Sequence, residues 1–145
     1  MKKFFVLCSI FAMIFGSNLI VNAANKVIDS MSIKPAQLGA GYQQANSFYV
    51  DEQALKTFKI KFNANLVALK NDIFNSNDNR VQINYIEADS TVDAEKVYKQ
   101  MIDLVGSSNV VAIKGDVVIE IITKSNDTKK HIIKLLKPTN VHTNY

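Results

Sequence analysis

Apolar residues recur at every second position over residues 81–85, with polar side chains between them. This period of two is typical of a strand with one buried face, and it predicts a strand over residues 80–88. An apolar run before it predicts another strand over residues 66–74. The residues at 75–79 are all Asn, Ser or Asp, which favour tight turns. The sequence therefore predicts an antiparallel hairpin.

The segment that follows has the period of a helix. Apolar side chains recur at steps of three and four over residues 94–105, after the capping residues 89–91. A second hairpin is predicted from the aliphatic runs at 110–113 and 117–122, with Gly115 in a tight turn that needs a positive φ. Nearly continuous aliphatic strands are covered on both faces, so we expect these two to lie centrally in the sheet.

A last helix is predicted between residues 125–127, which can cap its start, and Pro138. Its aliphatic residues would pack inward, whereas Lys129, Lys130 and Lys134 would face water. The order strand, strand, helix therefore occurs twice. We expect an α+β fold, namely an antiparallel sheet with helices packed mainly on one face and built from two hairpin-plus-helix units.

The remaining segments have weaker patterns. Residues 24–64 are expected to be an irregular part of the same domain, with a core over 65–138 and a flexible tail over 139–145. Apolar residues over 27–33 favour a short strand. Asp51 can cap a helix that begins at residue 52, and the alternative is a strand that continues through residue 62.

Residues 1–23 have the features of a secretory signal peptide. They combine a basic start, an apolar run over residues 4–15, and small residues just before the expected cleavage after Ala23. A retained anchor is the alternative, but a spanning helix needs about 20 apolar residues, and Gly16 ends this run. Cys8 lies inside the run, which disfavours a lipoprotein signal. We expect an exported bacterial protein, periplasmic or extracellular, with no membrane span after cleavage.

Composition narrows the possible chemistry. Cys8 is the only cysteine, so a chain without its leader has no disulfide and no thiolate nucleophile or ligand. The formal net charge of +4 includes two leader lysines, so the rest is nearly balanced. Arg80 is the only arginine. Because nucleic-acid binding needs a clustered basic face, no nucleic-acid partner is expected.

Few residues stand out as candidates for a site. Glu120 lies within the aliphatic run 117–122, and a carboxylate buried there would have a raised pKa, a frequent mark of function. Alternation along the strand would instead point Glu120 toward water or a lysine. Tyr42, Phe48 and Tyr49 would line a ligand groove or cap the core. We predict no catalytic set.

A metal site has one weak starting point in the sequence. Asp127 and His131 are four residues apart on one helix face, but no third ligand has a recognisable spacing. The pattern Gly-x-Ser-x-Gly does not occur in the sequence. We therefore predict neither a metal site nor a cofactor.

From residue 81 onward, the element order resembles that of SPOR domains, small envelope modules that bind denuded peptidoglycan glycan strands. The segments that carry the resemblance are residues 81–85, 93–95 on the helix, and 117–119. They cover less than half of the chain. The resemblance implies a further strand after the last helix, which would have to come from residues 141–145.

Together these features favour a non-catalytic exported domain that binds a protein or small ligand in the bacterial cell envelope. The first alternative is a SPOR-like glycan-strand binding module. The second is a small hydrolase that would use Glu120 as one of two carboxylates.

Overall fold

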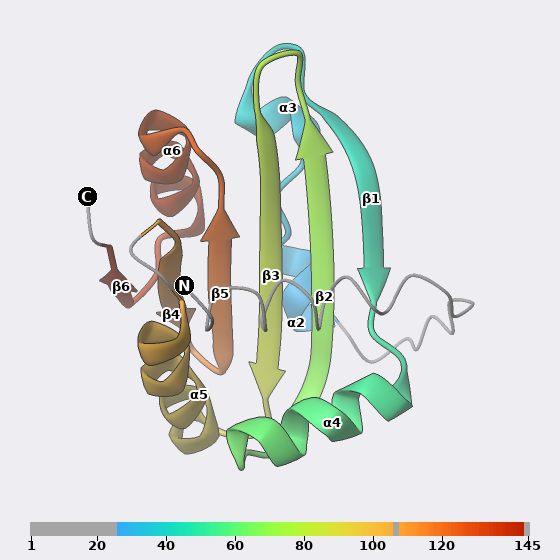
Figure 1. The fold of residues 1–145 in the computed structure, drawn as a ribbon, viewed down its shortest axis with the longest axis vertical. Helices are drawn as coiled ribbons and strands as arrows, with labels where there is room; N and C mark the ends of the chain where they lie inside the picture. Colours follow the sequence, from blue (N-terminus) through green and yellow to red (C-terminus); the bar gives the residue numbers. More distant parts are fainter. Residues whose placement is uncertain (1–25, 106–107, 144–145) are drawn as a thin grey trace.

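The computed structural model describes residues 26–105 and 108–143 (Figure 1). The predicted leader over residues 1–23, with its cleavage site and Cys8, lies outside the described residues. Within those two ranges, no helix is both long and apolar enough to cross a bilayer. The elements, in chain order, are α2 (Lys26–Met31), α3 (Pro35–Leu38), β1 (Gln43–Tyr49), α4 (Glu52–Phe62), β2 (Leu66–Asn75), β3 (Arg80–Ala88), α5 (Thr91–Leu104), β4 (Val110–Lys114), β5 (Val117–Ile122), α6 (Asn126–Leu136) and β6 (Asn140–His142).

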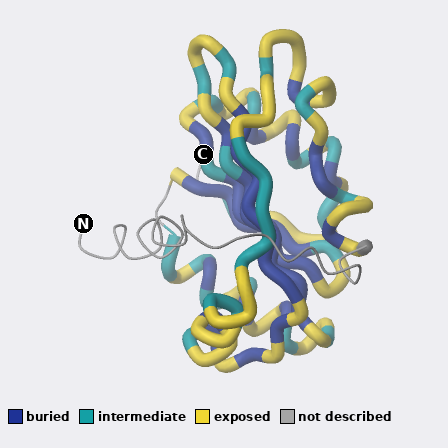
Figure 2. The backbone as a smooth tube through the Cα atoms, turned by 90° about the vertical axis from the view of Figure 1, so that its right-hand side faces the viewer, coloured by how far each residue is buried: buried dark blue, intermediate teal, exposed yellow. Residues whose placement is uncertain are grey.

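The strands form one antiparallel sheet in the order β1-β2-β3-β5-β4-β6 (Figure 1). The predicted α+β class and the order strand, strand, helix, strand, strand, helix from β2 to α6 are confirmed. The aliphatic strands β4 and β5 lie inside the sheet, as expected. Gly115, in the turn between them, has a φ of 59°. Figure 2 shows the buried strands passing through the centre of the molecule, with exposed residues concentrated at its ends.

Helices pack on both faces of the sheet, whereas the sequence pattern predicted mainly one face. On one side, α4 and α5 bring Phe58 and Met101 into a cluster of buried apolar residues. On the other side, α2 and α6 bring Ile28 and Ile132 into a second cluster. Each face therefore has its own core, and the sheet lies between them (Figure 1).

The chain connections explain why the two predicted units differ. Helix α5 connects β3 to β4 across β5, and α6 connects β5 to β6 across β4. Both crossovers move toward the same edge of the sheet, but β3 and β5 run in opposite directions. Two crossovers of the usual right-handed sense then place their helices on opposite faces. Local periodicity does not predict the face on which each helix packs, because that face depends on the strand order.

Residues Glu52–Phe62 form helix α4, so the alternative of a strand through residue 62 is wrong. Asp51 caps α4, because its Oδ1 accepts a hydrogen bond of 2.8 Å from the Ala54 N–H. Asn63 ends the helix in the left-handed conformation, with a φ of 48°. Phe58 is 1% exposed, whereas Ile60 on the same helix is 79% exposed. In a strand, residues 58 and 60 would point to the same side and have similar exposure. Their different exposure is therefore typical of a helix.

Three other segments differ from the sequence-based expectations. Residues 27–31 belong to helix α2, where a short strand was expected. The polar segment Gln43–Tyr49 forms β1, which pairs with β2 and was not predicted. Asn140–His142 pairs with β4 as β6, where a flexible tail was expected. In all three cases contacts with distant residues decide the local structure, and a short window shows little of them.

The different burial of two residues on α4 can be tested by matched substitutions. We expect Phe58→Ala to lower the free energy of unfolding by about 3–5 kcal/mol, because it empties a buried aromatic site. Ile60→Ala should change it by less than about 0.5 kcal/mol. Urea unfolding followed by circular dichroism measures both values. Equal losses in the two variants would contradict the helical assignment.

Candidate functional site

One face of the sheet carries two kinds of side chain along its strands. Leu69 of β2, Ile86 of β3 and Val118 of β5 are neighbours in one cross-strand row. They belong to the apolar cluster that α4 and α5 cover. This half of the face is therefore closed by helices.

A polar row lies next to this apolar row on the same face. Asn71 of β2 pairs with Asn84 of β3, and Asn84 pairs with Glu120 of β5. All three side chains are buried, and Glu120 is only 1% exposed. Phe48 of β1 is opposite Asn71 at the edge of the row. The interpretation in which Glu120 points toward water is thus wrong, because neighbouring strands and their side chains enclose it.

Two amide side chains hold the Glu120 carboxylate. Asn84 Nδ2 donates to Oε2 at 2.8 Å, and Asn109 Nδ2 donates to Oε1 at 2.9 Å. Asn84 Oδ1 accepts from Asn71 Nδ2 and, at 3.2 Å, from Gln82 Nε2. Because each carboxylate oxygen meets an N–H donor, this network matches the ionised form of Glu120.

Opposing effects act on the proton affinity of Glu120. Burial raises the pKa of its carboxyl group, whereas the hydrogen bonds from Asn84 and Asn109 and the charge of Lys61 lower it by a smaller amount. The net pKa is above the ordinary value. The folded chain therefore holds this proton more tightly than the unfolded chain does.

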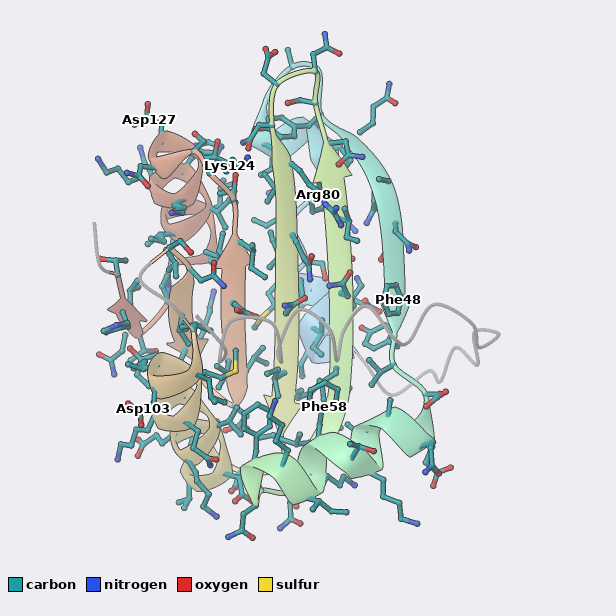
Figure 3. The ribbon with its side chains drawn as sticks, viewed as in Figure 1. Phe48, Phe58, Arg80, Asp103, Lys124 and Asp127 are labelled. Atoms are coloured by element: carbon teal, nitrogen blue, oxygen red, sulfur yellow. The ribbon has the colours of Figure 1, made fainter. Side chains whose placement is uncertain are left out.

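Beyond the polar row, the same face forms the floor of an open pocket of about 990 Å³. Asn71 lines this pocket, whereas Asn84 and Glu120 are not among its lining residues. In Figure 1, α4 and α5 cover the lower part of the sheet on this side and leave its upper part bare. Figure 3 places Phe48 on β1 at one side and Arg80 and Lys124 toward the upper end. We call this hollow the amide pocket, since Asn and Gln predominate in its lining. The lining comprises Phe48, Asn71, Ile73, residues 75–80, Gln82, residues 108–109, residues 122–124 and Lys129.

Asn71 leaves one polar atom of the amide pocket without a partner. The Oδ1 atom of Asn71 is buried, and no hydrogen-bond donor among the described residues reaches it. A buried acceptor that is left unsatisfied costs about 1–3 kcal/mol. A donor group from outside the chain would remove this cost, and Asn71 lines the pocket that such a group would enter.

Asn79 connects the β2–β3 turn to three other segments. Its Oδ1 accepts from Thr123 Oγ1 at 2.8 Å, and its Nδ2 lies 3.3 Å from Thr128 Oγ1. Asn79 Nδ2 also donates to Tyr42 Oη at 2.9 Å. Tyr42, one of the predicted site residues, thus helps to hold the turn, and it is not among the residues that line the pocket.

Tyr49, another predicted site residue, packs on the opposite side of the sheet from the amide pocket. Its Oη donates a hydrogen bond of 2.7 Å to Asp29 Oδ1, which also accepts from Lys70 Nζ at 3.2 Å. Burial and the bond to Asp29 raise the pKa of Tyr49. These contacts attach α2 to the sheet. The structure therefore does not bring Glu120, Tyr42 and Tyr49 together in one site.

Asp127 and His131, the pair considered for metal binding, lie on the surface of α6. His131 Nε2 lies 2.6 Å from the carbonyl oxygen of Gln37, and both His131 and Asp127 are exposed. Across residues 26–105 and 108–143, no group of three or more His, Cys, Asp or Glu residues is arranged to hold a metal ion.

The burial of Lys129 differs from the prediction. It was expected to face water with Lys130 and Lys134, but it is only 5% exposed and lines the amide pocket. Its Nζ donates to Asn126 Oδ1 at 3.2 Å. The reason is positional, because the first turn of α6 lies against the pocket and the later turns do not.

The sequence pattern marked Gln82 and Asn84 only as the polar side of a strand, and it did not point to Asn71 or Asn109. Of the three aromatic residues considered for a ligand groove, Phe48 lines the pocket and the two tyrosines do not. A usable signal was present, because polar residues recur at alternate positions in several aliphatic strands. Which of these positions become neighbours depends on the pairing register, and this is a property of the folded sheet.

Comparisons with protein-family models, with curated proteins and with solved structures found no match to this chain. The pocket lining offers amide donors and acceptors, one aromatic ring, aliphatic floor residues and three cationic side chains. Such a mixture suits a ligand that has both hydroxyl groups and apolar ring faces.

The raised pKa of Glu120 predicts a pH effect on stability. An acid with a raised folded-state pKa stabilises below its unfolded value near 4.5, and this stabilisation is lost as pH rises through the folded-state pKa. Glutamine does not titrate, so the Glu120→Gln variant does not lose this stability as pH rises. The variant's stability relative to the unaltered protein should therefore rise with pH, by up to about 1.4 kcal/mol per pH unit.

Urea unfolding between about pH 4.5 and pH 7.5 measures this difference. Glu95→Gln, at an exposed position on α5, is the matched control and should show no such trend. A difference between Glu120→Gln and the unaltered protein that stays constant with pH would contradict the assignment.

Proposed function

We propose that this protein is a non-catalytic binding domain of the bacterial cell envelope, and that its amide pocket binds an oligosaccharide. The observation that carries the proposal is Asn71 Oδ1, a buried acceptor without a partner in the lining of an open pocket. A ligand hydroxyl would satisfy it. The neighbouring pocket amides, including Gln82 and Asn109, provide further donors and acceptors for hydroxyl groups.

Phe48 supports a ring-shaped ligand. It lies at the β1 side of the amide pocket, in the same cross-strand row as Asn71. An aromatic ring in this place can pack against the apolar face of a sugar while Asn71 accepts from a hydroxyl group. This pairing of one ring with adjacent amides supports a sugar over a purely aliphatic ligand.

The width of the pocket supports a ligand longer than one ring. Its lining extends from Phe48 of β1 to Ile122 of β5, across β2 and β3. Three interstrand spacings correspond to roughly 14 Å. We therefore expect an oligosaccharide to contact more of the lining than a monosaccharide does.

A specific form of this proposal is binding of peptidoglycan glycan strands. One observation favours it, because Asn140–His142 supplies a strand after the last helix, which the resemblance to SPOR domains requires. The resemblance lies in element order, and the assignment of this ligand remains a proposal. Glu120 supports binding over hydrolysis, because both carboxylate oxygens already accept hydrogen bonds from Asn84 and Asn109.

Ligand binding can be tested by titrating the isotope-labelled protein with soluble chitin oligosaccharides and recording amide NMR spectra. We expect shifts in residues of the amide pocket, and about tenfold weaker binding for Phe48→Ala. Ile60→Ala, which removes an exposed apolar side chain outside the pocket, should bind normally. Co-sedimentation with insoluble peptidoglycan tests the glycan-strand form. Absence of pocket shifts, or unchanged affinity in folded Phe48→Ala, would contradict the proposal.

Export is the other part of the proposal, and it rests on the pattern of residues 1–23. In a bacterial host that expresses the full chain, the protein recovered from the envelope should lack residues 1–23 by intact-mass analysis. Ala23→Leu should retain them, because signal peptidase requires a small residue before the cleaved bond. Recovery of the unaltered protein at full-length mass would contradict cleavage.

A further inference from the structure

We infer that the saccharide bound by the amide pocket is acidic, and that its anionic group lies at the corner formed by Arg80 and Lys124. The inference rests on the proposed function and adds the charge of the ligand and its orientation. Both cations line the pocket. Arg80 is the first residue of β3, and Lys124 follows the end of β5. Figure 3 shows them at the upper end of the sheet.

The strand register brings the segments that carry these two cations side by side. Gln82 of β3 pairs with Ile122 of β5 in the antiparallel sheet. Arg80 precedes Gln82 by two residues, and Lys124 follows Ile122, the last residue of β5, by two, so both lie at the same end of the sheet, where both line the pocket. Two like charges at the same end of the sheet repel each other. An anion between them converts this repulsion into two attractive contacts.

A hydrogen bond between the preceding residues holds this arrangement. Thr123 Oγ1 donates to Asn79 Oδ1 at 2.8 Å, and these residues directly precede Lys124 and Arg80. Thr123 is buried and Asn79 is partly buried, so the bond is partly shielded from water. The segments that carry the two cations are therefore joined by the fold before any ligand arrives, which lowers the entropy cost of binding an anion.

The charge around this corner is positive. Lys129, from the first turn of α6, also lines the pocket and is buried. Asp78 is the one acidic residue in the pocket lining, and it lies in the exposed β2–β3 turn. Arg80 can bind a carboxylate with two parallel N–H groups, a geometry that lysine does not offer.

The same geometry sets the direction of the ligand. Phe48 lies on β1, and Lys124 lies beyond β5 on the other side of β2 and β3 (Figure 3). A ring stacked on Phe48 and an acidic group at Lys124 are thus at opposite sides of the amide pocket. This arrangement fits an oligosaccharide with its carboxylate on a sugar other than the one that contacts Phe48.

A matched pair of ligands tests the inference. The neutral probe is the disaccharide of N-acetylglucosamine, and the acidic probe is the same disaccharide with a lactyl ether carboxylate on one sugar. We expect the acidic probe to bind about tenfold more tightly by calorimetry or NMR titration, as for one charge-assisted hydrogen bond. Raising the ionic strength from about 0.05 M to about 0.5 M should remove most of this preference.

Substitutions separate the charge effect from binding itself. Arg80→Gln and Lys124→Gln should each abolish the preference for the acidic probe and leave the affinity for the neutral probe within about twofold. Lys134→Gln, at an exposed position on α6 outside the pocket, is the control and should keep the preference. Both Arg80 and Lys124 are exposed, and the dispersion of the amide spectrum verifies that the variants are folded.

Two results overturn the inference in different ways. Equal affinity for the two probes, or a preference that survives Arg80→Gln and Lys124→Gln, would refute the acidic ligand and leave oligosaccharide binding intact. Failure of both probes, and of longer neutral chitin oligosaccharides, to shift any residue of the amide pocket would refute the proposed function and the inference together.

Discussion

A carboxylate in the middle of a buried aliphatic strand is the constraint on which the rest of the site depends. Glu120 can stay in the sheet only if donors surround it, because an unpaired buried charge is costly. Asn84 on the next strand and Asn109 beside β4 supply these donors. Their polarity interrupts the apolar face that α4 and α5 cover, and the uncovered part of this face becomes the amide pocket.

The strand order determines which part of this sheet face stays free of helices. Because α5 and α6 cross on opposite faces, only the lower part of the pocket-bearing face receives helices (Figure 1). The beginning of α6 still reaches the rim through Lys129. Asn79 and Thr123 then fix the β2–β3 turn beside the end of β5. The unsatisfied Asn71 acceptor and the cationic corner thus line one hollow, and Asn109 connects this hollow to the buried Glu120.

Much of the fold could be predicted from periodicity. The strands around the residue 75–79 turn, the amphipathic α5 and the central position of β4 and β5 depend on local patterns that survive in the folded chain. The expectation that helices pack mainly on one face is wrong, because the side on which a crossover helix lies depends on strand order. Of the site, the sequence pointed to Glu120 by its aliphatic neighbours. Its amide partners could not be identified without the register, which makes distant residues neighbours.

The most direct test of this account is a carbon-13 NMR titration of the Glu120 carboxyl group, together with the side-chain amide signals of Asn84 and Asn109. The account predicts a midpoint above the ordinary glutamate value of 4.5. It also predicts that both amide groups shift with the same midpoint, since they donate to this carboxylate. A midpoint at or below the ordinary value, or amide signals that do not respond, would contradict it.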